Sequence, residues 1–326
     1  MATSGNQTQK GKAFEFACAQ AIYESQQGDI DVELINSPQF DTAERCFAYL
    51  QAFEQDNYIK GAEAAIKIIN RLEPNLFSGN GTLRVGLQTD SQGIEGDVRD
   101  VLCRRGKDWQ IGLSCKHNHE AVKHSRLSDT IDFGKEWFGK PCSQEYFKEV
   151  RKVFHPLRQM RDDSLSFDKS HPALWSEIPD KEDRCYVPVL QAFMKELKRL
   201  DSEYPGEIPK LLIRYLIGKY DFYKVIMNER RRFTQIESMN VNGTLSQRAG
   251  KKRALVDAPV MKLPTKFYEI GFKDGFKNTI VVVCDEGWNV SMRIHNASSR
   301  VEPSLKFDVR LLAMPSSILT QIEPWD

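Results

Sequence analysis

The sequence has almost no net charge, no long apolar run and no closely spaced pair of cysteines. Its formal net charge is +1, so a nucleic-acid surface would need basic residues concentrated in one region. The longest apolar run, residues 279–284, is too short to span a bilayer, and the N-terminus lacks the apolar segment of a secretory signal. We therefore expect a cytoplasmic protein that does not enter a membrane.

The seven cysteines are far apart in the chain, and none forms a C-x-x-C motif. This spacing indicates buried thiols in a reducing compartment rather than a zinc ribbon or a disulfide framework. The sequence also lacks G-x-G-x-x-G and G-x-x-x-x-G-K-[ST], which removes the main support for a dinucleotide or P-loop site. Hydrophobic residues make up 40% and charged residues 28%, as in ordinary globular proteins.

The periodicity of apolar residues predicts helices, then strands, then helices and finally strands again. Helical spacing dominates residues 10–75, and strand-like segments follow at 83–88, 97–105 and 108–116, the last two joined by a tight hairpin at 106–108. Helices return in 120–160 and again before 220, on either side of a polar, Pro-bearing loop at 161–183. Segments 266–272, 278–285, 288–296 and 304–314 predict an antiparallel meander. This order predicts an α/β or α+β fold with a mixed sheet rather than a doubly wound parallel fold.

The strand-like segment "WQIGLSCK" (109–116) has two contrasting faces. Because side chains alternate along a strand, Ile111, Leu113 and Cys115 share an apolar face that belongs in the core. Gly112, Ser114 and Lys116 share the other face, a pattern that suits a site better than open solvent. The preceding strand carries Asp97 and Asp100, three apart and so on opposite faces, and one of them can look across the hairpin at Ser114 and Lys116.

An acid, a second oxygen ligand and a lysine on neighbouring strands can hold Mg²⁺ and a water against a phosphate. Mg²⁺ prefers oxygen ligands, polarises the phosphoryl oxygen and lowers the pKa of bound water. The lysine would steady the attacking water or the developing charge. The alternative interpretation is an ordinary Asp–Lys cross-strand ion pair at the edge of a sheet.

The order acid, apolar strand, hairpin and strand ending in lysine looks like the PD-(D/E)xK nuclease core. The longer runs "KGKAFEFA", "IGLSCKHNHEAVKHSRLS" and "RIHNASSRVEPSLKFDVRLL" resemble the HaeIII family of type II restriction endonucleases over residues 10–312. The resemblance implies a mixed β-sheet flanked by helices, with a C-terminal antiparallel β region. It also implies one nuclease domain with insertions, made of a helical N-terminal part (10–75), a catalytic core (83–160), a helical insertion (161–220) and a β-rich DNA-recognition part (221–326).

Carried over onto this sequence, the resemblance makes Lys116 the motif lysine and Asp100 the metal-binding aspartate, with Asp97 as runner-up. The sequence departs from the motif at Ser114, where an Asp or Glu is usual. Serine is a weaker, neutral ligand, so a second carboxylate must come from elsewhere or the metal is held less tightly.

Glu15, in the first expected helix, is the candidate for that second carboxylate, because related nucleases often use a glutamate there. The alternative is that Glu15 is a solvated helical acid. The backbone carbonyl of Cys115 can also bind the metal without needing a particular side chain.

The histidines near Lys116 do not complete another known motif. "KHNH" spells His-Asn-His, but the nucleases of that name use dispersed residues. His117 and His119 could bind zinc in principle, yet no third ligand of fixed spacing appears.

Three segments carry basic and polar side chains that we expect to contact DNA, through phosphates or through base edges. The alternatives are a solvated helix face for the first segment and a polar hairpin loop for the last. The expected contacts are Lys123, His124, Ser125 and Arg126 after the motif lysine, Lys251 and Lys252 in a basic loop, and Arg293, His295, Asn296, Ser298 and Arg300 at the end of a strand.

The resemblance implies Mg²⁺-dependent cleavage of double-stranded DNA at GGCC, leaving blunt ends with 5′-phosphates. A palindrome is read most simply by a two-fold dimer, so we expect a homodimer at least on DNA. A cognate DNA methyltransferase in a prokaryotic host is the expected genetic partner. The alternatives are another PD-(D/E)xK nuclease, for repair or RNA processing, and a DNA-binding protein that does not cleave.

Overall fold

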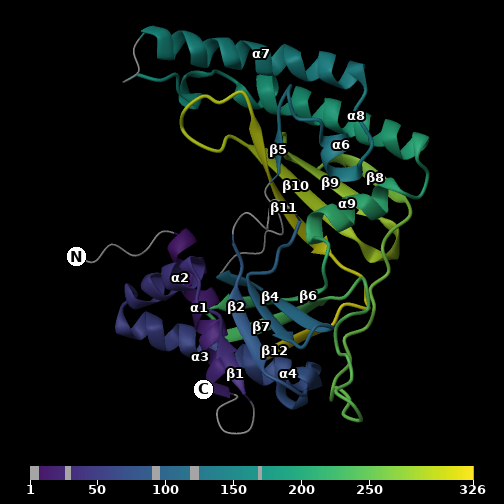
Figure 1. The fold of residues 1–326 in the computed structure, drawn as a ribbon. Coiled ribbons are helices and arrows are strands. Elements are labelled where there is room, and N and C mark those ends of the chain that lie inside the picture. Colours follow the sequence, from purple (N-terminus) through teal and green to yellow (C-terminus); the bar gives the residue numbers. More distant parts are fainter. Residues whose placement is uncertain (1–6, 26–30, 90–95, 118–124, 168–170, 326) are drawn as a thin grey trace. The chain divides into compact units, whose positions relative to one another are not determined.

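The computed structural model describes residues 7–25, 31–89, 96–117, 125–167 and 171–325 (Figure 1). The described residues form a seven-stranded and a five-stranded sheet. By its internal contacts the chain divides into two compact units, each holding one of these sheets. The first unit comprises residues 1–120, 218–262 and 316–326, and the second comprises 121–217 and 263–315.

The first unit holds a mixed seven-stranded sheet in the order β1-β2-β3-β4-β6-β7-β12. The pairs β1/β2 and β4/β6 are parallel and the other pairs are antiparallel, so the prediction of a mixed sheet is confirmed. The bounds are Val32–Leu34 (β1), Leu83–Leu87 (β2), Val101–Arg105 (β3), Trp109–His117 (β4), Phe222–Asn228 (β6), Phe233–Met239 (β7) and Thr320–Pro324 (β12).

The helices of the first unit begin and end at clear sequence signals. The Ser37 side chain caps the second helix by accepting a hydrogen bond from the Phe40 N–H, and Pro38 occupies its first turn. The third helix ends at Leu72, just before Pro74. Their bounds are Gln7–Ser25 (α1), Pro38–Ala48 (α2), Ala52–Leu72 (α3) and Pro74–Ser78 (α4).

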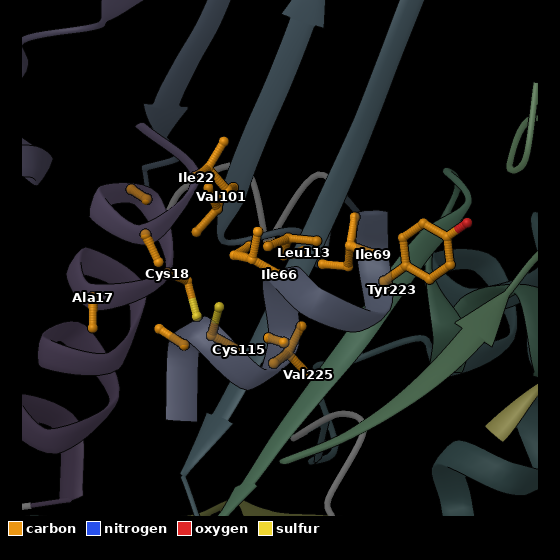
Figure 2. Packing of buried hydrophobic residues seen from close by; sticks show 14 of the residues in the cluster. Ala17, Cys18, Ile22, Ile66, Ile69, Val101, Leu113, Cys115, Tyr223 and Val225 are labelled. Carbon is orange, nitrogen blue, oxygen red and sulfur yellow. The ribbon is translucent and has the colours of Figure 1, made fainter. Parts of the chain in front are cut away.

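Helices α1 and α3 pack against the sheet and bury its apolar face (Figure 2). Ile111, Leu113 and Cys115 of β4 are all buried in this core, which confirms the predicted apolar face of that strand. Cys18 of α1 lies directly against Cys115, with the two sulfur atoms facing each other in Figure 2. The core therefore fixes the position of α1 along β4.

The second unit confirms the predicted antiparallel meander, in the sheet order β5-β11-β10-β9-β8. Its helices pack around an aromatic cluster in which Trp137 stacks on Tyr215 with ring centroids 4.6 Å apart. The strands are Arg126–Leu127 (β5), Phe267–Phe272 (β8), Thr279–Cys284 (β9), Asn289–His295 (β10) and Leu305–Ala313 (β11). The helices are Phe133–Phe138 (α6), Gln144–Phe167 (α7), Val187–Glu203 (α8) and Ile208–Ile217 (α9), with short helical turns at Trp175–Glu177 (η1), Glu182–Tyr186 (η2) and Asp285–Gly287 (η3).

Two element boundaries differ from those expected. The loop predicted at 161–183 begins later, because α7 continues to Phe167 through a segment without Gly or Pro to end it. The strand predicted from residue 97 begins at Val101, so Asp97 and Asp100 both precede β3 and strand alternation does not separate them. In the part of the chain that the structure describes, no helix combines the length and apolarity needed to cross a membrane.

Gly112 of β4 lies where the Arg99 side chain crosses the sheet. A Cβ at this position would lie 2.1 Å from the Arg99 Cδ. Arg99 cannot easily move away, because its guanidinium makes two hydrogen bonds of 2.7 Å to the Asp97 carboxylate and both residues are buried. The absence of a side chain at 112 therefore permits this buried ion pair.

We predict that Gly112→Ala lowers the free energy of unfolding by about 1–3 kcal/mol, the usual cost of overpacking a buried site. Urea denaturation would measure it. Gly11→Ala in α1 is the control, because a Cβ there meets no atom within 4 Å and alanine favours a helix. Equal stability of Gly112→Ala and the unmodified protein would contradict the close approach of Arg99.

Candidate active site

Three consecutive residues of β4 converge on one carboxylate oxygen of Asp100. The Cys115 N–H donates to Asp100 Oδ2 at 2.7 Å, the Lys116 Nζ donates at 3.3 Å and the Ser114 Oγ donates at 3.4 Å. The Asp100 N–H in turn donates to the Leu113 carbonyl at 2.7 Å. Backbone and side-chain bonds thus fix Asp100 beside the end of β4.

Glu15 of α1 lies close enough to this cluster for its charge to be affected. It is 7% exposed, and Lys12, one helical turn earlier, donates to Glu15 Oε2 at 3.2 Å. Burial and then the charge of Asp100 raise the pKa of Glu15 to about 7, although Lys12 and Lys116 act in the opposite direction. Two carboxylates in such surroundings favour the binding of a cation.

Lys116 is half-buried and keeps its charge. Burial by itself would lower the pKa of its ammonium group, but the neighbouring Asp100, Cys115 and Glu15 outweigh burial and raise that pKa above its ordinary value. Lys116 is therefore a fixed positive charge beside Asp100.

The backbone carbonyl of Cys115 points toward the same place. In an extended strand the N–H and C=O of one residue point to the same side, and the Cys115 N–H points at Asp100. Asp100, Glu15 and this carbonyl together offer two carboxylates and one neutral oxygen, which is a donor set that fits Mg²⁺. Among the described residues, no group of three or more His, Cys, Asp or Glu side chains could hold a metal by itself.

The structure places Asp97 apart from Lys116, in a different set of contacts. Both of its oxygens accept from Arg99, and Oδ2 also accepts from the Gln88 amide at 2.7 Å. Burial opposes ionisation of Asp97, but the bonds from Arg99 and Gln88 outweigh it and lower its pKa. Asp97 is thus engaged in a buried ion pair, whereas Asp100 contacts Ser114 and Lys116.

Lys12 is the one residue near the site that the sequence patterns did not single out. The signal for it was available, since Lys12 and Glu15 are three apart and so share a helix face. His117 is buried, contacts Glu229 at 3.2 Å and stacks near Tyr58. Residue 119 lies outside the described residues.

The DNA-contact candidates near β5 differ in exposure. Lys123 and His124 lie outside the described residues. Ser125 is buried, and its hydroxyl is 3.0 Å from the Tyr215 hydroxyl. Arg126 is exposed and donates to Glu302 and Ser304 at 3.0 and 2.9 Å.

The candidates at the end of β10 form a connected polar group in the second unit. Arg293 donates to Asp308 at 2.7 Å, and His295 lies 3.3 Å from the same carboxylate. Asn296 accepts from the Tyr186 hydroxyl at 2.9 Å. The remaining two members of the group are Ser298, which donates to the carbonyl of the fifth member, and Arg300 itself, which is exposed.

Lys251 and Lys252 occupy an exposed turn of the first unit, within the loop that the sequence predicted. The backbones of Ala249 and Lys252 pair with each other, and the Lys252 Nζ donates to Ser78 at 2.9 Å. Lys251 is exposed at the tip of the turn.

Comparison with known proteins identifies the family. The family model described as HaeIII restriction endonuclease matches residues 11–315. Over 324 residues the chain is 38% identical to the Type II restriction enzyme HaeIII of Haemophilus aegyptius, a match that covers 99% of each protein. No solved structure matches the chain. The chain therefore belongs to the HaeIII family of type II restriction endonucleases, which are site-specific deoxyribonucleases.

Proposed function

We propose that this endonuclease hydrolyses double-stranded DNA with Mg²⁺, at a PD-(D/E)xK-like site formed by Asp100, Glu15 and Lys116. The observation that carries the proposal is the convergence of Ser114, Cys115 and Lys116 on one oxygen of Asp100. Membership of the family supports the reaction, and this geometry supports the choice of residues.

Each residue of the proposed site has a distinct task. Mg²⁺ held by Asp100, Glu15 and the Cys115 carbonyl would polarise a phosphoryl oxygen and lower the pKa of a bound water. Lys116, whose ammonium is held by Asp100, orients the attacking water and neutralises charge that develops on the phosphate. Attack in line with the leaving oxygen releases a 3′-hydroxyl and leaves a 5′-phosphate. Ser114 occupies the usual position of an acid, and Glu15 supplies the second carboxylate.

We further propose GGCC as the target, cut between G and C to leave blunt ends, as the family resemblance implies. Its two-fold symmetry favours a homodimer on the DNA, each protomer contacting one half-site. Such an enzyme needs a cognate methyltransferase to protect the DNA of its host, in the bacterial cytoplasm. Digestion of one plasmid followed by run-off sequencing tests the target, because a nuclease without sequence preference would leave no discrete fragments and a protein that only binds would leave the plasmid uncut.

Lys116→Ala should reduce the cleavage rate at least 10²–10³-fold, the order lost when one preorganised electrostatic group is removed. DNA affinity should stay close to that of the unmodified enzyme, since one amine adds little to many phosphate contacts. Plasmid cleavage and gel-shift assays would measure the two effects. Lys277→Ala is the matched control, because that lysine pairs with Asp183 on the surface of the second unit. Near-normal cutting by Lys116→Ala would remove Lys116 from the site.

Asp100→Asn and Asp97→Asn should fail in different ways. Asp100→Asn removes a metal ligand, so we expect no cleavage at any Mg²⁺ concentration and a stability close to normal. Asp97→Asn leaves Arg99 as a poorly compensated buried charge, so we expect a loss of about 3 kcal/mol in the free energy of unfolding. The Asp97→Asn molecules that remain folded should still cut. Cleavage by Asp100→Asn together with an inactive but stable Asp97→Asn would exchange the two assignments.

Arg293 and Arg300 are the residues that we propose for reading guanine, because arginine can donate two hydrogen bonds to O6 and N7. Arg293→Ala or Arg300→Ala should cost about 1–3 kcal/mol of discrimination against a wrong base. Lys251→Ala or Lys252→Ala should instead weaken binding to all sequences and flatten the salt dependence. Competition binding on GGCC and single-base variants at fixed salt would measure this. If both arginine variants lose affinity equally for every sequence, the arginines contact phosphates and Arg126 becomes the next candidate.

A further inference from the structure

The first unit carries a groove of about 730 Å³ along β2 and β3, outside the cluster around Asp100. The groove extends from Gly106 and Lys107, in the β3–β4 turn, to Gln88 and Thr89, beyond the end of β2. Its floor includes Leu102 of β3. The functional assignments above leave this groove without a role.

The groove lies on the same sheet face as Lys116. In the antiparallel pairing of β3 and β4, Leu102 is opposite Gly112 and Arg104 is opposite Gln110. Directly opposite residues of an antiparallel pair point to the same face. Along β4, residues 110, 112, 114 and 116 share one face, so the groove-lining Leu102 and Arg104 share the face of Lys116.

One end of the groove adjoins the candidate metal ligand. The Gln88 N–H donates to the Asp100 carbonyl at 2.9 Å, so the last groove residues of β2 are bonded directly to Asp100. From Asp100, the strand leads through Leu102 to Arg104, four residues on. At the rise of a β-strand this separation is ~13 Å.

The charge of the groove is positive. Three of its lining residues, Arg84, Arg104 and Lys107, are basic and none is acidic. Glu33 beside the groove neutralises Arg84 at 3.0 Å. Arg104 and Lys107 are exposed, and neither has a hydrogen-bond or ion-pair partner among the residues that the structure describes.

We propose that this groove binds the sugar-phosphate backbone of the substrate DNA outside the recognition sequence, with Arg104 and Lys107 contacting phosphates. Phosphates of one DNA strand recur every ~3.4 Å along the helix axis, so ~13 Å from Asp100 corresponds to about four nucleotides. A four-base-pair site cut at its centre ends two nucleotides from the scissile phosphate. The groove therefore contacts flanking DNA and adds affinity that is independent of sequence. This inference depends on the proposed position of the scissile phosphate beside Asp100.

The test uses the full-length protein and two 24-base-pair duplexes that contain the sequence cut by the unmodified enzyme. In the second duplex, neutral methylphosphonates replace the phosphates three to five nucleotides from each scissile phosphate. Binding is measured by fluorescence anisotropy without Mg²⁺, over a range of salt concentrations. The variants are Arg104→Ala/Lys107→Ala, the charge-preserving Arg104→Lys/Lys107→Arg, and Lys60→Ala as control. Lys60 lies on α3, the helix that packs on the opposite, apolar face of the sheet, and pairs with Asp56.

The unmodified protein should bind the methylphosphonate duplex about tenfold more weakly than the native one. The double alanine variant should bind both duplexes equally weakly, and its salt slope should fall by about 2, close to 0.9 for each lost phosphate contact. The charge-preserving variant and Lys60→Ala should keep the normal slope.

Normal affinity of the double alanine variant for the native duplex would overturn the proposal, as would an equal loss of affinity on both duplexes. Because binding is measured without cleavage, a failure here is distinguishable from a failure of the catalytic site. That site would be refuted by a Lys116→Ala protein that still cuts DNA, whatever the groove variants do.

Discussion

The hydrogen bond from the Cys115 N–H to Asp100 joins the core of the first unit to its candidate active site. On one side of the strand, the Cys115 thiol packs against Cys18 and so fixes α1 along β4 (Figure 2). Glu15 lies almost one turn before Cys18 and is thereby brought within electrostatic reach of Asp100. On the other side, the next residue, Lys116, reaches the same carboxylate. The positions of all three charged groups therefore depend on how α1 and Asp100 meet one strand.

Strand alternation was sufficient to predict the buried face of β4 and to single out Lys116, because both depend on neighbouring residues of one strand. The choice between Asp97 and Asp100 was beyond it. Both residues precede β3, and what separates them is the Arg99 guanidinium, which binds Asp97. Arg99 has room to do so only because Gly112, on another strand, lacks a side chain. A contact of this kind depends on tertiary structure, so no local pattern announces it.

The sheet order shows the same limit on a larger scale. β4 pairs in parallel with β6, although the whole of the segment 121–217 separates them and belongs to the second unit. The apolar residues of β6 indicate a buried strand, but nothing in them specifies β4 as the neighbour. The meander of β8 to β11 was predictable because its strands follow one another directly and pair with their neighbours in sequence. The family, by contrast, was accessible from long runs of sequence, and those runs carry no information on the pairing of β4 with β6.

Charge balance explains why the proposed site needs a divalent cation. Two carboxylates, Glu15 and Asp100, face two ammonium groups, Lys12 and Lys116, so the four side chains are close to neutral when all are ionised. A phosphodiester adds one negative charge, and further charge develops on its oxygens as the water attacks. In a half-buried site this charge is poorly screened by solvent, and Lys116 alone is already engaged by Asp100. The raised pKa of Glu15 reflects the same shortage of positive charge. A cation bound by both carboxylates would stabilise their ionised forms and leave the Lys116 ammonium available to the reacting phosphate.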